Sequence, residues 1–288
     1  MRDFPIPVVA FGPGSQSLED EGLEFMPMPK AEPLVTPIPP EDASRDELLA
    51  AADVVEQLIE AMARQGVGSE DAPRFSLRAI APGTLRALNE SLGQGEVSAV
   101  VSMADGRPGW RIQETAFAGV WRVQRDDGRG ALVEDILEAG GMPLVVKEAA
   151  RQANGARLDI GQLRSDVMNA PALVNEIRHH AKAYLAGQPA HVLNLSLLPL
   201  SQADHEALDQ LLGEGSVAIL SRGFGNCRIN STRARSVWRV RYYNSMNTLI
   251  LDTIEVVDIP EAASAAAEDY EDSMVRLREL LSWLREDQ

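Results

Sequence analysis

The stretch GVWRV occupies residues 119–123, and a near copy, SVWRV, occupies residues 236–240. The chain has only four tryptophans, so two of them in one shared context indicate a repeated unit. Successive side chains of a strand point to opposite faces, so each copy predicts a tryptophan on one face and an arginine on the other. We expect the tryptophans to fill the core of each repeat and the arginines, Arg122 and Arg239, to pair with carboxylates. The alternative is a symmetric groove in which these two arginines bind a partner.

The repetition extends well beyond the two pentapeptides. With an offset of 120, the segment that begins at Ser76 matches the segment that begins at Ser196. With an offset of 117, RIQETAFAGVWRV (111–123) matches RINSTRARSVWRV (228–240). Two long matched blocks separated by one three-residue gap predict an internal duplication.

The hydrophobic pattern predicts one helix and five strands in each copy. Short connections between the later strands favour antiparallel hairpins. The predicted fold class is therefore α+β: two tandem homologous β-α-β-β-β-β modules with mainly antiparallel sheets, related by pseudo-twofold symmetry and flanked by helices. The first copy has strands at 75–80, 96–103, 110–116, 118–125 and 131–138 and a helix at 83–92; the second has strands at 191–198, 216–221, 227–232, 236–243 and 247–256 and a helix at 202–212.

Proline is concentrated at the N-terminus, where nine of the seventeen prolines lie within the first 40 residues. Proline fixes φ and removes a backbone donor, so this segment is expected to form an extended arm. Further helices are expected at about 46–66, within 143–185 with a break near Pro171, and at 261–285. The predicted organisation is an extended Pro-rich arm (1–43), a helix plus the first module (44–150), a helical connector (151–190) and the second module with a C-terminal helix (191–288).

The formal charge of −16 in 288 residues argues against binding to nucleic-acid phosphates or to an anionic membrane. A single cysteine excludes an intrachain disulfide and a thiolate metal site within one chain. The N-terminus has no secretory signal pattern, and no apolar run approaches 18 residues. We therefore expect a cytoplasmic protein that does not insert into a membrane.

Motifs for catalysis or metal binding are weak. GPGS at 12–15 lacks the lysine of a phosphate-binding loop. The adjacent histidines 179 and 180 would point about 100° apart on a helix, and His191 and His205 have no partners at ligand spacing in the sequence. We therefore expect no cofactor, no metal and no catalytic residues.

The loop SRGFGNCRI (221–229) differs most from its counterpart in the first copy. It contains two glycines, an aromatic residue, an amide, the single cysteine and two arginines. A loop that diverges within a repeated scaffold is a candidate for function. The alternative is a hairpin whose glycines supply positive φ angles.

Several of these segments resemble the HupH/HyaF family of hydrogenase expression/formation proteins. The similarity rests on IPVVAFGPGSQ near the N-terminus, on HVLNLSLLPLSQADHEALDQLLGEGSVAILSRGFGNCRINSTR, on VWRVRYYNSMNTLILDTIEVVDIPEAA, and on AAEDYEDSMVRLREL. It covers the N-terminal segment and most of residues 170–285, and the first copy resembles the same module more loosely.

The resemblance implies an accessory protein of [NiFe]-hydrogenase biosynthesis, a chaperone or scaffold without catalytic activity. Its implied partners are the precursor of the iron–sulfur small subunit, before export, and other maturation proteins. Two alternatives stay open: an enzyme with its site at the interface of the two modules, and an iron–sulfur or metal carrier that uses Cys227 together with a cysteine of another chain. The candidate partner-binding residues are Gly12, Pro13, Gly14, Ser15, Gln16, Ser221, Arg222, Gly223, Phe224, Gly225, Asn226, Cys227, Arg122 and Arg239.

Overall fold

The computed structural model describes residues 40, 42–68, 71–103, 108–153, 158, 160–223 and 225–286, so most of the expected N-terminal arm lies outside the described part. The helices of the described part are α1 (Arg45–Gln65), α2 (Pro82–Leu92), α3 (Leu144–Arg151), α4 (Ala170–Ala183), α5 (Gln202–Leu212) and α6 (Ala267–Arg285), with 3-10 turns η1 (Ile160–Gln162), η2 (Leu195–Leu197) and η3 (Glu261–Ala263). Its strands are β1 (Arg74–Ser76), β2 (Val97–Ser102), β3 (Pro108–Glu114), β4 (Val120–Asp126), β5 (Leu132–Ala139), β6 (His191–Asn194), β7 (Glu214–Ser221), β8 (Asn226–Thr232), β9 (Val237–Tyr243) and β10 (Leu249–Val256).

All ten strands form one open sheet rather than a separate sheet in each module. The strand order is β1-β5-β4-β3-β2-β7-β8-β9-β10-β6, and every neighbouring pair is antiparallel. The two sequence halves meet where β2 pairs with β7, from Val97 opposite Ser221 to Val101 opposite Val217. The α+β class and the antiparallel pairing are therefore confirmed, and the sheet is continuous across both halves.

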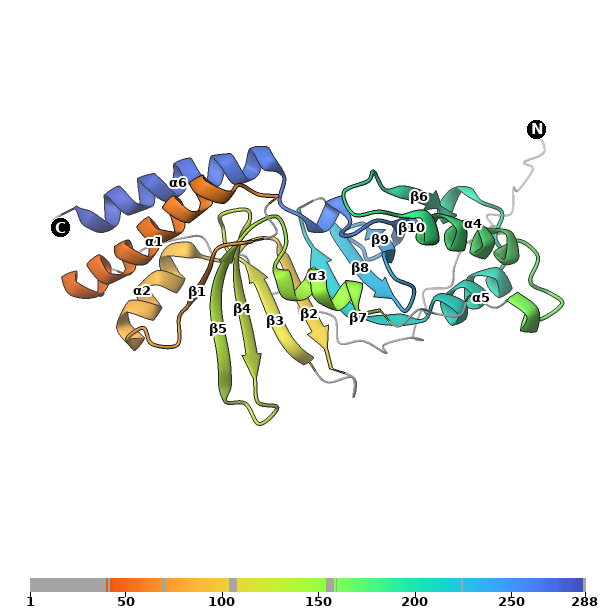
Figure 1. The fold of residues 1–288 in the computed structure, drawn as a ribbon, viewed down its shortest axis with the longest axis horizontal. Helices are drawn as coiled ribbons and strands as arrows, with labels where there is room; N and C mark the ends of the chain where they lie inside the picture. The colour runs from red at the N-terminus through yellow and green to blue at the C-terminus, as the bar shows by residue number, and fades with distance from the viewer. Residues whose placement is uncertain are drawn as a thin grey trace, which may run out of the picture.

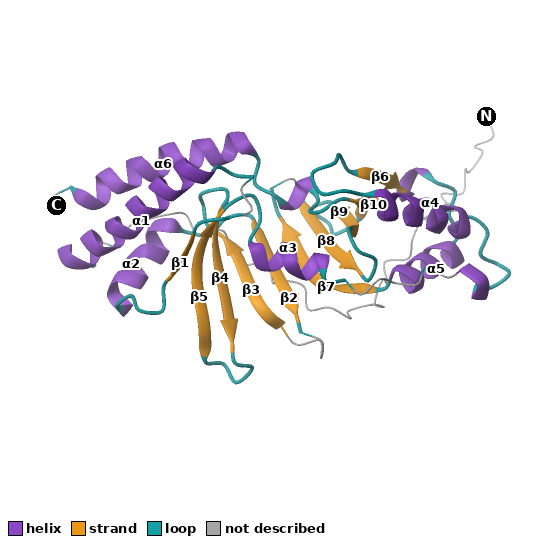
Figure 2. Ribbon diagram, viewed as in Figure 1, coloured by secondary structure: helices purple, strands orange, loops and turns teal. Residues whose placement is uncertain are grey.

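Helices gather at both ends of this sheet and over its middle (Figures 1 and 2). α1, α2 and α6 form one core with buried side chains of β4 and β5. α4 and α5 form a second core with side chains of β6, β9 and β10. A third core lies under α3 and η3 and joins both halves through the opposite face of the central strands. The domain therefore depends on three apolar clusters that are linked by one sheet.

The two VWRV tryptophans lie in this third core, as expected, and expose none of their surface. Trp121 donates a hydrogen bond from Nε1 to the carbonyl of Gly140 at 2.8 Å. Trp238 donates to the carbonyl of Val257 at 3.1 Å, and Val257 lies 117 residues after Gly140. Each indole thus buries a large apolar ring and donates to a backbone carbonyl, and Trp238 Nε1 also lies 3.1 Å from the carbonyl of Asp258.

The first residue of each pentapeptide, Gly119 or Ser236, lies in a tight turn just before the strand. Gly119 has φ +78°, and a Cβ there would lie 2.5 Å from the ring of Tyr270 on α6. Ser236, at the corresponding place, also has a positive φ of 58°. Left-handed backbone is uncommon for residues other than glycine, so the second half keeps the turn at some conformational cost.

Several predicted element ends are wrong for identifiable reasons. The strand expected over 191–198 ends at Asn194, whose side chain accepts the Ser196 N–H and starts the turn η2. The helix expected from 261 begins only at Ala267, after η3. Pro171 does not break a helix but lies in the first turn of α4, where a missing N–H costs nothing.

Two helices pack across the predicted module boundaries. α4 falls in the expected connector 151–190, but its buried residues Val174 and Ile177 belong to the core of the second half. α6 follows the second half in sequence, yet Leu277 and Leu284 pack against α1 in the core of the first half. The C-terminal helix therefore connects the end of the chain to the first half of the fold.

Candidate functional site

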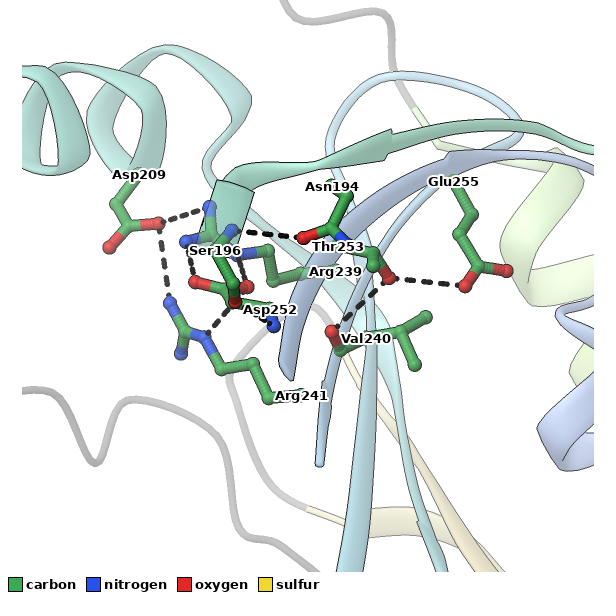
Figure 3. Close-up of polar contacts among 9 residues, drawn as sticks. All are labelled: Asn194, Ser196, Asp209, Arg239, Val240, Arg241, Asp252, Thr253 and Glu255. Carbon is green, nitrogen blue, oxygen red and sulfur yellow. Dashed lines mark hydrogen bonds and ion pairs between the residues drawn. The ribbon is translucent and has the colours of Figure 1, made fainter. Parts of the chain in front are cut away.

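The arginine of the second VWRV stretch belongs to a compact charged cluster on β9 and β10 (Figure 3). Arg239 contacts Asp252 through Nε and Nη2, both at 2.5 Å, and both side chains are buried. Asp209 on α5 lies 3.3 Å from Arg239 and 3.5 Å from Arg241. The backbone N–H of Asp252 donates to Ser196 Oγ at 2.8 Å. Such a bidentate buried pair is fully engaged within the chain.

The first half holds an equivalent cluster. Arg122 on β4 makes a bidentate contact with Asp135 on β5 and also contacts Asn89 on α2. Asp135 lies 117 residues before Asp252, and Asn89 lies 120 residues before Asp209, so both offsets found in the sequence are reproduced. The expectation that both arginines pair with carboxylates over the sheet is confirmed.

The two arginines do not form a common groove. β4 and β9 are separated by β3, β2, β7 and β8, so Arg122 and Arg239 lie five strand spacings, roughly 24 Å, apart. The two guanidinium groups are therefore too far apart to act together in one active site at the module interface. Arg122 and Arg239 retain a structural role that the contacts explain.

Residues 221–227 of this loop contain the turn between β7 and β8 together with the strand ends that flank it, and only part of the segment is accessible. Ser221 and Cys227 are buried strand residues that pair with each other. Gly223 and Gly225 are exposed, whereas Arg222 and Asn226 are partly exposed. Phe224 lies outside the described residues, as do the candidates Gly12, Pro13, Gly14, Ser15 and Gln16.

Arg222 anchors this hairpin to the first half of the sheet. Its N–H donates to the Glu96 carbonyl at 3.1 Å, and its Nη2 reaches the Gly95 carbonyl at 3.4 Å. Gly223 lies over the Glu96 side chain, since a Cβ at this position would be 2.3 Å from Glu96 Oε2. The hairpin tip is thus held in place at its base while Gly223 and Gly225 face solvent.

Cys227 lies in the central core and is only 2% exposed. Burial raises the pKa of its thiol to about 12, against a hydrogen bond with Tyr242 that lowers it. A thiol of this kind is protonated at neutral pH and is a poor nucleophile or metal ligand. The geometry therefore argues against a carrier in which Cys227 meets a cysteine from another chain.

One buried acid was missed by the sequence reasoning. Glu114 at the end of β3 lines a cavity of about 250 Å³ together with Asn89, Gln94, Gln113 and Arg122. Burial raises the Glu114 pKa to about 7, although the N–H of Gly119 donates to Oε1 at 3.1 Å. The only signal in the sequence is an acid at the end of an alternating strand, where the second copy has Ser231.

Glu114 and Arg122 are the two ionisable side chains among the described residues that line this cavity. Thr115 is the hydroxyl residue of the described lining, and its Oγ1 donates to the carbonyl of Phe117 at 3.2 Å. Arg122, its one cation, is already engaged by Asp135 and Asn89. The cavity lies within the first half of the fold, away from Arg239.

The helices of the described part do not include a candidate membrane span. None of them is both long enough and apolar enough to cross a bilayer.

The described part of the chain is an α+β domain whose VWRV arginines pair with carboxylates, whose thiol is buried, and whose β7–β8 hairpin is partly exposed. A family model described as "HupH hydrogenase expression protein, C-terminal conserved region" matches residues 48–163 and again residues 167–284. The chain belongs to this family of hydrogenase expression proteins.

Individual relatives extend the match to nearly the whole chain. The hydrogenase expression/formation protein HoxQ of Cupriavidus necator is 44% identical over 286 residues, which cover 99% of each chain. The protein HupH of Rhodobacter capsulatus is 40% identical over 289 residues, 99% of this chain and 100% of the relative. The hydrogenase-1 operon protein HyaF of Escherichia coli is 40% identical over 201 residues, 69% of each.

Among solved structures, the hydrogenase expression protein HupH from Thiobacillus denitrificans is similar to part of the chain. The two are 28% identical, with a TM-score of 0.37, over 40% of this chain and 95% of that structure.

Proposed function

We propose that this protein is a cytoplasmic chaperone or scaffold in [NiFe]-hydrogenase maturation that binds the precursor of the iron–sulfur small subunit before export and catalyses no reaction. The observation that carries the proposal is similarity over 99% of the chain to a protein named for hydrogenase expression and formation. A maturation protein of this kind needs a stable surface on which a folding partner can bind. We include other maturation proteins among its partners.

The side-chain chemistry supports a binding role. The two arginine clusters satisfy their charges within the sheet, and the single thiol is buried and protonated. Side chains that are already paired or buried within the protein are poorly placed to react with a substrate. The formal charge of −16 favours a basic partner segment, and the export sequence of the precursor is our candidate for that segment.

We place the partner contact at the exposed tip of the β7–β8 hairpin. Gly223 and Gly225 are exposed there, and Arg222 fixes the tip against Gly95 and Glu96. Because Arg222 is already held by hydrogen bonds to Gly95 and Glu96, ordering it on binding costs less conformational entropy. This narrows the sequence candidates to Arg222, Gly223, Gly225 and Asn226 within the described part of the chain.

We also infer that the two halves arose by tandem duplication and are related by a pseudo-twofold axis between β2 and β7. The family model matches the chain twice, and the strand order β1-β5-β4-β3-β2 is mirrored by β6-β10-β9-β8-β7. The equivalent tryptophan donors and arginine clusters support the same inference. The hairpin 221–227 then lies where the two copies have diverged.

Replacement of Gly223 by tyrosine is expected to weaken capture of the small-subunit precursor by at least about tenfold, or 1.4 kcal/mol. The bulky ring would stand on the binding surface, while the fold tolerates it because Glu96 is a flexible side chain that can move aside. The measurement is co-purification of the precursor with the tagged full-length chain. Arg129→Tyr, on the exposed tip of the β4–β5 hairpin, is the matched control and is expected to leave capture unchanged.

Equal losses for both variants would show that the β7–β8 hairpin is not the contact. Failure of the unaltered protein to retain the precursor would overturn the proposed function itself. Capture of the precursor with and without its export sequence tests the charge argument separately. Equal retention of both forms would rule out masking of that basic segment.

A further inference from the structure

Three side chains that sequence spacing did not connect meet at one corner of the fold. Glu176 and His180 lie one helical turn apart on α4, and His191 is the first residue of strand β6. His191 Nε2 is 3.0 Å from Glu176 Oε1. The rings of His180 and His191 are stacked, with centroids 3.4 Å apart and planes 9° from parallel. One donor atom from each residue lies within 4.8 Å of the other two. His191 therefore has neighbours in space that are not apparent from its spacing in the sequence.

The surrounding structure fixes this arrangement from both sides. On α4, Val174 and Ile177 are buried in the core of the second half, which holds the helix in place. On β6, His191 pairs with Val256 of β10. The connection between them is short, and Tyr184 anchors it because its hydroxyl accepts the N–H of Asp258 at 3.0 Å. Ligands that project from rigid elements keep their relative positions better than ligands on loops.

A third histidine ring lies beside the stacked pair. His179 lies edge-on to His180, with ring centroids 5.3 Å apart. A neutral imidazole keeps the lone pair that a metal ion requires.

We propose that Glu176, His180 and His191 bind one divalent transition-metal ion of the Zn²⁺ or Ni²⁺ type. Two imidazoles and one carboxylate form a donor set that suits these ions, whereas Ca²⁺ and Mg²⁺ prefer oxygen ligands. Glu176 and His191 expose 44% and 31% of their side chains, which leaves room for water or for a donor from a partner as a further ligand.

The stack itself must change when the ion binds. In-plane lone pairs of two parallel rings cannot converge on one point, so at least one imidazole has to rotate about χ2. Binding therefore replaces the stacking contact with two metal–nitrogen bonds. The rotation is a side-chain movement at the partly exposed surface and leaves α4 and β6 in place.

Calorimetric titration of the metal-stripped full-length chain with Zn²⁺ alone and with Ni²⁺ alone tests the proposal. We expect one ion per chain at micromolar or tighter affinity, and no comparable site for Mg²⁺. The double variant His180→Gln, His191→Gln is expected to weaken this binding by at least about tenfold, since each ligand contributes to affinity. His205→Gln on α5 is the matched control and is expected to bind like the unaltered chain.

Imidazole NMR signals provide a second measurement that does not depend on affinity. Shifts confined to His180 and His191 at one equivalent of Zn²⁺ would support the site. Unchanged affinity in the double variant, when urea unfolding shows that it is folded, would overturn the proposal. The absence of stoichiometric binding of either ion to the unaltered chain would also overturn it. Neither outcome would affect the hydrogenase-maturation proposal, which does not depend on this site.

Discussion

Replacement of Asp204 by alanine is expected to lower the free energy of unfolding by about 3–5 kcal/mol, because buried donors are left without partners. Asp204 is fully buried at the start of α5. Its Oδ1 accepts the N–H groups of Met168, Asn169 and Ala170 at 2.7–2.9 Å, which caps the N-terminus of α4. Its Oδ2 accepts from the backbone and side chain of Ser201 at 3.0 and 2.8 Å. One carboxylate thus joins two helix N-termini.

Urea unfolding of Asp204→Ala measures this cost, and Ser44→Ala is the matched control. Ser44 caps α1 through the same kind of capping box, but at an exposed helix end. Loss of such an exposed cap costs about 1 kcal/mol. If Asp204→Ala cost no more than Ser44→Ala, the role of Asp204 as a buried link between the helices would be wrong.

The Asp204 carboxylate should also make the folding stability depend on pH. Burial alone would raise the pKa of Asp204, but the N–H groups of Ala170, Ser201 and Asn169 outweigh it and hold this pKa well below its usual range. A depressed folded-state pKa contributes stability above the unfolded value of 3.8, and this contribution is lost as pH falls below that value. The difference in stability between the unaltered chain and Asp204→Ala should therefore shrink as the solution is acidified below about pH 4.

Replacement of Trp121 or Trp238 by alanine is expected to cost about 3–5 kcal/mol each, as for other large core aromatics. Both rings are fully buried between the sheet and the α3–η3 layer, so removal leaves a cavity. It also leaves the carbonyl of Gly140 or Val257 without its indole donor. Because the two sites are equivalent in the two halves, we expect similar costs for the two variants.

Tryptophan-to-phenylalanine variants separate the two contributions. Phenylalanine keeps most of the buried ring but removes the indole N–H, so we expect a smaller cost than for alanine. Trp110→Ala on β3 serves as a control because Trp110 is only partly buried and lies under Arg125. A cost below about 1 kcal/mol for either core variant, typical of an exposed position, would contradict its place in the core.

Features of the fold that depend on a few neighbouring residues, such as helix ends and the alternation of side chains along a strand, follow from local sequence patterns. Ser201 caps α5, and the glycines after α2 and α5 end those helices with positive φ, in keeping with the preferences of these residue types. The alternation in VWRV correctly placed tryptophan in the core and arginine over the sheet. Such features depend on a few neighbouring residues, so the sequence carries them directly.

Contacts between distant segments could not be predicted in this way. Nothing in a single strand indicates that β2 pairs with β7 and merges both halves into one sheet. The packing of α6 on α1 joins segments that are more than 200 residues apart. The meeting of His191 with Glu176 and His180 depends on the reversal between α4 and β6. Spacing rules for metal ligands consider neighbours in sequence, which is why they missed it.

Hydrogen exchange of the full-length chain, with and without the small-subunit precursor, tests the central claim most directly. The account predicts slower exchange at the accessible residues of the β7–β8 hairpin and at the adjoining segment 93–96, where Arg222 is anchored. It predicts no change at the β4–β5 hairpin, residues 127–131. No complex with the precursor, or a complex whose protection leaves the β7–β8 hairpin unchanged, would contradict it.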